Sequence, residues 1–127
     1  PINDLGFLYF NGALGFTRDP GKAIELFQKA ADLRHPEAMF NIAALIDDGD
    51  VPNSTLADAA KYLYAALRSG NNDVLNLLSD NPRMFKKGTR RALQKLMADN
   101  ALYDGALDAD FGPQTKRSLR RAYGIEE

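Results

Sequence analysis

The sequence contains no cysteine, no tryptophan and a single histidine, His35. Without cysteine the chain has no disulfide, no thiol nucleophile and no cysteine-based zinc site. A metal site needs several converging ligands, so the lone His35, between two helical patterns, is expected to be a turn or cap residue. The composition therefore predicts no metal site and no other cofactor.

Long apolar runs are also missing. No stretch approaches the roughly eighteen apolar residues that cross a bilayer, and no basic leader followed by an apolar segment opens the chain. The sequence begins at Pro1 rather than at Met and is already within a helical pattern, which favours a piece of a longer protein. We therefore expect membrane attachment only through a segment outside this sequence.

Charge is divided unevenly along the chain. Residues 1–82 carry six Lys and Arg against eleven Asp and Glu, a net charge of −5, whereas residues 83–124 carry ten against four, a net charge of +6. This break predicts two modules, residues 1–82 and residues 83–127. A basic second module favours an anionic partner. Nucleic acid is not expected, because no known reading motif is present and the acidic first module repels a duplex.

The first module repeats itself. The segment LGFLYFNG (residues 5–12) aligns with AALIDDG (residues 43–49) at an offset of 37, and the helical stretch from Ala23 aligns with that from Ala59 at an offset of 36. Within each stretch, apolar residues recur at the spacing of an amphipathic helix. The pattern predicts an all-α fold in which antiparallel helix pairs stack into a solenoid.

Local signals mark where these helices begin and end. Thr55 is placed to cap one helix and Gly70 to end it. A third unit begins at Asn72 and stops after one helix. Because about three units are needed for stability, something must cover that helix. We expect residues 74–78 to pack against residues after Met84.

The repeats resemble the Sel1-like family, which is related to the tetratricopeptide repeats. The second unit departs from the family pattern, because Ala43 replaces the glycine and Ile46 the tyrosine. The resemblance implies a helix solenoid with a concave face, used by adaptor and scaffold proteins, and therefore a protein partner on the concave face. The residues that carry it are Leu5, Gly6, Tyr9, Gly12, Asp19, Ala23, Phe27, Ala30, Ala31 and Ala38.

The second module reads as helix, loop, helix, and its loop YDGALDADFGPQT (residues 103–115) allows three interpretations. The first is a calcium-binding loop. Neither a loop that starts at Asp104 nor one that starts at Asp108 supplies the required oxygen ligands, so this interpretation fails. As a catalytic acid pair, Asp104, Asp108 and Asp110 lack any nearby cause of a raised pKa and any assisting His or Cys. We therefore expect no catalytic residues and no enzyme activity.

The third interpretation is structural. Gly105 and Gly112 are expected to adopt backbone angles closed to other residues, and Asp104 and Asp108 to close Asx-turns. Apolar residues then anchor the loop in the core. The expected anchors are Leu102, Leu107 and Phe111.

The same segment resembles the three-helix type of peptidoglycan-binding domain. The matching residues are Leu93 and Gln94, residues 103–105, Leu107 and Asp108, residues 111–113, and Thr115, while Ala109 replaces a glycine of the pattern. The resemblance implies non-catalytic attachment to peptidoglycan or its peptide stems, with a short helical module packed on the end of the solenoid. The ligand-binding residues that the motif implies are Gln94, Tyr103, Asp108 and Thr115. Arg117 and Arg121 are added as ligand-binding residues because the peptide stems carry carboxylates, to which basic side chains donate charge-assisted hydrogen bonds.

The order of the two modules is similar to the periplasmic end of PodJ-type polar localisation proteins of alphaproteobacteria. That resemblance implies a non-catalytic scaffold in the periplasm at a cell pole, joined to the inner membrane by one span upstream and helping to position polar organelles. Two alternatives stay open. The chain is a protein-binding adaptor whose last module only caps the solenoid, or it is the wall-targeting part of a larger enzyme.

Overall fold

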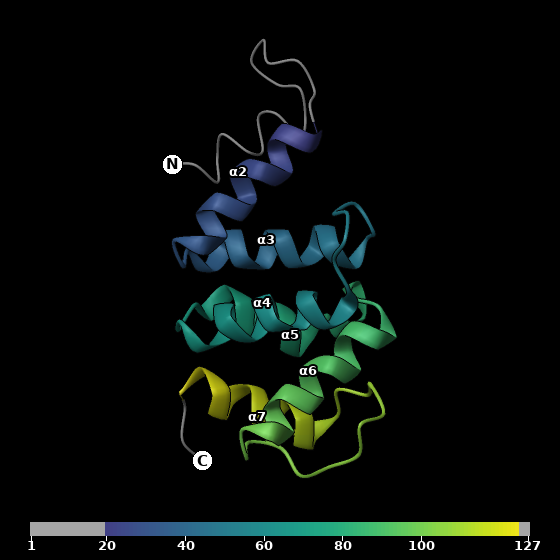
Figure 1. Ribbon diagram of the computed structural model, residues 1–127. Helices are drawn as coiled ribbons and strands as arrows, with labels where there is room; N and C mark the ends of the chain where they lie inside the picture. The colour runs from purple at the N-terminus through teal and green to yellow at the C-terminus, as the bar shows by residue number, and fades with distance from the viewer. Residues whose placement is uncertain (1–19, 125–127) are drawn as a thin grey trace.

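A computed structural model describes residues 20–124 as a stack of helices without strands (Figure 1). This finding confirms the all-α prediction, while the helix expected at residues 5–12 lies outside the described residues. The elements are α2 (Pro20–Asp32), α3 (Pro36–Asp47), α4 (Leu56–Arg68), α5 (Asn72–Asp80), a 3₁₀ turn (Pro82–Met84), α6 (Lys87–Asp99) and α7 (Pro113–Tyr123).

The predicted boundary signals work as expected around α4 and α5. The Thr55 hydroxyl accepts the backbone N–H of Asp58 at 3.3 Å, and the Asp58 carboxylate accepts that of Thr55 at 3.0 Å. This reciprocal pair satisfies two donors that a helix start leaves free. Gly70 follows α4 with φ +84°. Asn71 then caps α5 by accepting the N–H of Val74 at 3.1 Å.

Helix α3 is the centre of the repeat region, because α2 packs against one side of it and α4 against the other. A helix covered on both sides must be apolar over most of its circumference. Small side chains let the neighbouring backbones approach it closely, and Ala30 of α2 and Ala66 of α4 are both fully buried. The buried residues of α3 are Ala38, Met39, Phe40, Ile42, Ala43, Leu45, Ile46 and Asp47.

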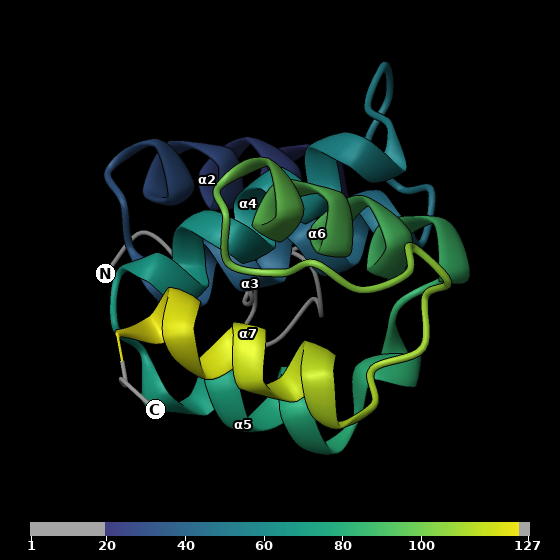
Figure 2. The same ribbon diagram turned by 90° about the horizontal axis from the view of Figure 1, so that it is seen from below.

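The last two helices continue this stack. Helix α6 packs against α4, and α7 contacts both α4 and α5. Figure 2 shows α7 lying beside α5. Leu93, Met97 and Leu119 from these helices belong to the same hydrophobic core as Leu63 and Leu67 of α4. The expectation that residues 74–78 pack against residues after Met84 is therefore confirmed. The module boundary between residues 82 and 83 stays a prediction.

A buried carboxylate joins the repeats to α6. Asp47, the last residue of α3, is 2% exposed. Its Oδ1 accepts the Thr89 hydroxyl at 2.6 Å and the backbone N–H of Lys86 at 3.0 Å. A carboxylate is favoured at a helix N-terminus, where backbone donors are free and the helix dipole is positive. Asp47 thus caps α6 from more than one repeat earlier in the chain.

Candidate functional site

The loop between α6 and α7 is organised around Gln94, which is fully buried. Its Nε2 lies 3.1 Å from Thr115 Oγ1, 3.2 Å from the Asp110 carbonyl and 3.3 Å from Asp108 Oδ1. Its Oε1 accepts the N–H of Ala109 at 2.8 Å. Thr115 is also buried, at 2% exposed. These bonds use both ends of the Gln94 amide to hold the loop.

Asp108 is an exposed member of this network. Its Oδ1 accepts the backbone N–H of Asp110 at 2.9 Å, which confirms the predicted Asx-turn. That backbone donor, followed by the side chain of Gln94, holds the pKa of Asp108 below its usual value. The loop therefore presents an ionised carboxylate at its surface.

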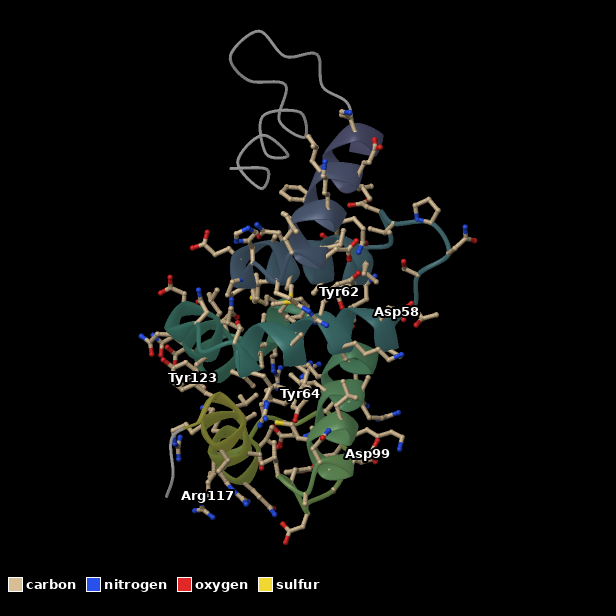
Figure 3. All side chains as sticks on the ribbon, turned by 60° about the vertical axis from the view of Figure 1, so that its left-hand side comes forward. Asp58, Tyr62, Tyr64, Asp99, Arg117 and Tyr123 are labelled. Carbon is tan, nitrogen blue, oxygen red and sulfur yellow. The ribbon has the colours of Figure 1, made fainter. Side chains whose placement is uncertain are left out.

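The other implied ligand residues lie apart from this cluster. Tyr103 is 8% exposed and donates its hydroxyl hydrogen to the carbonyl of Ala106. Arg121 donates to the carbonyl of Leu102 at 3.3 Å, and Arg117 lies on the exposed side of α7 (Figure 3). The structure thus brings Gln94, Asp108 and Thr115 together in one hydrogen-bonded cluster, whereas Tyr103 and Arg121 bond to the carbonyls of Ala106 and Leu102. Whether these six residues bind a ligand stays a prediction.

Two expectations about the loop are wrong. Leu107 is 41% exposed and so does not anchor the loop, although Phe111 is buried and Leu102 packs partly against the core. Asp104 does not close an Asx-turn, because its carboxylate accepts a hydrogen bond from the side chain of Gln114. The loop is therefore held from its two ends and by Gln94.

The glycine expectation is also wrong. Neither Gly105 nor Gly112 has positive φ, and the residues between α6 and α7 that are left-handed are Ala101 (φ 61°) and Ala109 (φ 64°). Gly105 is required for space instead, because an added Cβ would lie 2.6 Å from the Tyr103 hydroxyl oxygen. Ala109 takes the left-handed conformation at the position where the peptidoglycan-binding pattern has glycine.

A groove between α3 and α5 is a site that the sequence interpretation missed. It encloses about 290 Å³. Leu77 is 39% exposed there, whereas Val74, Leu75 and Leu78 of the same helix are buried. In the sequence, the signal for this groove was that Leu77 lies off the helix face shared by Val74, Leu75 and Leu78. The residues that line the groove are Phe40, Val74, Leu77, Glu37, Asp73, Asn41 and Asn71.

The groove has an apolar floor and acidic edges. Phe40 is fixed by an edge-to-face contact with Phe85, whose ring centroid lies 5.5 Å away at an interplanar angle of 83°. Glu37 and Asp73 bring two carboxylates, while none of the lining residues is a cation. An apolar side chain flanked by Lys or Arg would complement both properties.

Residues 20–124 contain neither a candidate metal cluster nor a candidate membrane-spanning helix. Between residues 20 and 124, no three His, Cys, Asp or Glu residues are grouped so that they could hold a metal ion. None of the helices in that range has the length and apolar character to span a bilayer. His35 is the residue before α3 and its side chain makes no capping hydrogen bond, in agreement with a turn or cap position.

Comparison with known families identifies the repeat family to which the helix pairs belong. The model of the family described as Sel1 repeat matches residues 2–35 and residues 36–71, more than half of the chain. The chain belongs to the Sel1 repeat family. Sel1 repeats are generally a non-catalytic fold for protein interaction. No curated protein and no solved structure matches the chain.

The second Sel1 match corresponds to α3 and α4 and ends where α5 begins. The groove therefore lies between the first helix of a matched Sel1 unit and the helix that follows that unit. The resemblance of residues 83–127 to a peptidoglycan-binding module stays a prediction.

Proposed function

We propose that this chain is a non-catalytic scaffold module that docks a partner protein in the groove between α3 and α5. The exposed apolar floor of the groove, bordered by two carboxylates on a Sel1 unit, is the observation that supports this proposal. In this proposal, the predicted concave face of the repeats corresponds to this groove. The partner contributes an apolar side chain to the floor and a basic residue beside Glu37 or Asp73.

Site-specific photocrosslinking in cells tests the docking proposal. With the photoreactive amino acid p-benzoylphenylalanine in place of Leu77, we expect a discrete protein adduct, because Leu77 is apolar and exposed in the groove. The same amino acid in place of Lys61, on the exposed surface of α4, is the control and should give no such adduct.

Charge variants make the crosslinking result specific. Glu37→Gln together with Asp73→Asn should reduce the Leu77 adduct several-fold, because the basic flank of the partner loses both carboxylates. Equal labelling from positions 77 and 61, or an adduct insensitive to the two charge changes, contradicts docking in this groove.

We further propose that the module acts in the periplasm at a cell pole, as in PodJ-type proteins, and attaches to peptidoglycan. This finer proposal rests on the motif in the loop and on chemistry, since peptide stems carry carboxylates and α7 carries exposed Arg117 and Arg121. In this arrangement the membrane span belongs to a segment outside the sequence.

Binding to purified sacculi tests wall attachment. We expect the chain to co-sediment with sacculi, and the double change Arg117→Gln and Arg121→Gln to lower the bound fraction several-fold. The matched control is Lys22→Gln with Lys61→Gln, which removes the same charge from the repeat region and should leave binding unchanged. Equal losses for both variants indicate nonspecific charge attraction and contradict a wall site on α7.

The adaptor alternative is favoured by a specific observation. Gln94 and Thr115 are buried and bonded within the loop, so that part of the motif builds the scaffold. If sacculi retain no chain, the last module acts as a cap and the protein as an adaptor. The further alternative, the wall-targeting part of a larger enzyme, requires a hydrolase motif in flanking sequence.

A further inference from the structure

A second cavity, of about 290 Å³, opens between the start of α6 and the loop before α7. Arg83, Lys87 and Arg90 line it with cations. Residues 108–110 also line the cavity and supply negative charge through the carboxylates of Asp108 and Asp110. The lining is thus almost entirely charged and contains both signs.

These opposite charges line one cavity without pairing. Lys22 pairs with Glu25 and Lys95 pairs with Asp99, and both of these ion pairs lie outside the cavity lining. No cation of the lining lies within 4.0 Å of the Asp108 or Asp110 carboxylate oxygens. Each set of charges is therefore available to a ligand group of opposite sign.

The loop side of the cavity is held rigidly. Arg90 Nη1 donates to the Ala109 carbonyl at 2.8 Å, and Gln94 accepts the Ala109 N–H at 2.8 Å. These two bonds keep Ala109, which is 2% exposed, in its left-handed conformation. A lining fixed before binding loses little entropy when a ligand arrives.

One polar atom beside the cavity lacks a partner. Arg90 Nε is buried and makes no hydrogen bond. A buried unsatisfied donor costs free energy, and in a native protein it calls for an explanation. A small adjustment of Arg90 as an anion enters the cavity would give this donor its acceptor.

We infer that this cavity binds a zwitterionic ligand, one that carries a carboxylate and an ammonium group. The carboxylate lies with Arg83, Lys87 and Arg90, and the ammonium group lies with Asp108 and Asp110. A simple anion would face the two carboxylates, and a simple cation would face the three basic residues, so neither complements the whole lining. The volume is at the small end for ligand sites, which suits an amino acid or a short peptide.

This assignment is independent of docking in the α3–α5 groove and of wall attachment. Two sources share the required chemistry, because both of their ends are free: a short L-peptide, and a short peptide with D-residues that has been released from a wall peptide stem. The two stereoisomers of one dipeptide distinguish these sources.

The test is a titration of the full ¹⁵N-labelled chain with L-alanyl-L-alanine and with D-alanyl-D-alanine, followed by NMR. We expect amide shifts in residues 87–90 and 108–110 with one or both stereoisomers. The N-acetylated and the C-amidated dipeptides each lack one charge, so each should bind about tenfold more weakly or worse. A preference for the D-form assigns short peptides released from the wall, and a preference for the L-form assigns ordinary short peptides.

Matched variants complete the experiment. Lys87→Gln and Asp110→Asn each remove one charge from an exposed lining residue and should weaken binding about tenfold. Lys95→Gln removes the same charge from α6 outside the cavity and should change the affinity less than about twofold. No shifts at about 10 mM dipeptide, where a millimolar site is mostly occupied, or equal binding of the blocked dipeptides, overturns the inference.

Discussion

A chain that ends at Pro82 is expected to lose its cooperative thermal unfolding transition. The deletion removes α6 and α7, which cover α4 and α5. Three fully buried side chains, Leu93, Met97 and Leu119, disappear with them. Losing one such side chain costs about 2 to 5 kcal/mol. Losing all three therefore removes stability comparable to the whole free energy of folding of a domain, about 5 to 15 kcal/mol.

Circular dichroism during heating, together with binding of a hydrophobic dye, measures this loss. The control is Leu67→Ala in the full chain, which weakens the same interface by about 2 to 5 kcal/mol and should keep a cooperative transition at a lower midpoint. A shortened chain that melts cooperatively at the unchanged midpoint would falsify the idea that the last helices complete the core.

The second large effect is expected for Gln94→Ala. The change leaves the N–H of Ala109 without its acceptor and Thr115 without a donor, and it opens a cavity where the fully buried amide lay. A buried polar group that loses its partner costs about 1 to 3 kcal/mol. With the cavity added, we expect the free energy of unfolding to fall by about 2 to 4 kcal/mol.

Chemical denaturation of matched variants separates the two causes. Gln94→Met keeps most of the volume but removes the amide, so it isolates the cost of the hydrogen bonds. Lys95→Ala changes the exposed neighbouring position on α6 and should stay within about 0.5 kcal/mol of the unaltered chain. If Gln94→Ala also stays within that range, Gln94 does not hold the loop.

Helix existence and most helix ends were predictable because their causes are local. Thr55 and Asp58 lie three residues apart, so the capping box is visible in the sequence. The repeat offset likewise predicts the pairing of α3 with α4, because repeated units bury the same faces. The cap that Asp47 gives to α6 was not predictable, since its partners lie 39 and 42 residues away.

The candidate sites were harder to predict because they depend on exposure. Leu77 and Leu78 are neighbours of the same type, and only the packing of α5 decides that Leu78 is buried while Leu77 enters the groove. The conformation of Ala109 was hard to predict for a similar reason, because contacts with residues distant in the sequence determine it. Local preference would put glycine at its positive φ, but the bonds from Gln94 and Arg90 impose that conformation on alanine.

The contact between Asp47 and Thr89 has a consequence for biosynthesis. Translation delivers the repeats first, and the hydroxyl that satisfies this carboxylate follows 42 residues later. At typical elongation rates the nascent chain waits for several seconds with that end of α3 still open to water. Completion of the fold is therefore a late event, and ribosome-bound intermediates arrested before Thr89 should be the forms that chaperones recognise.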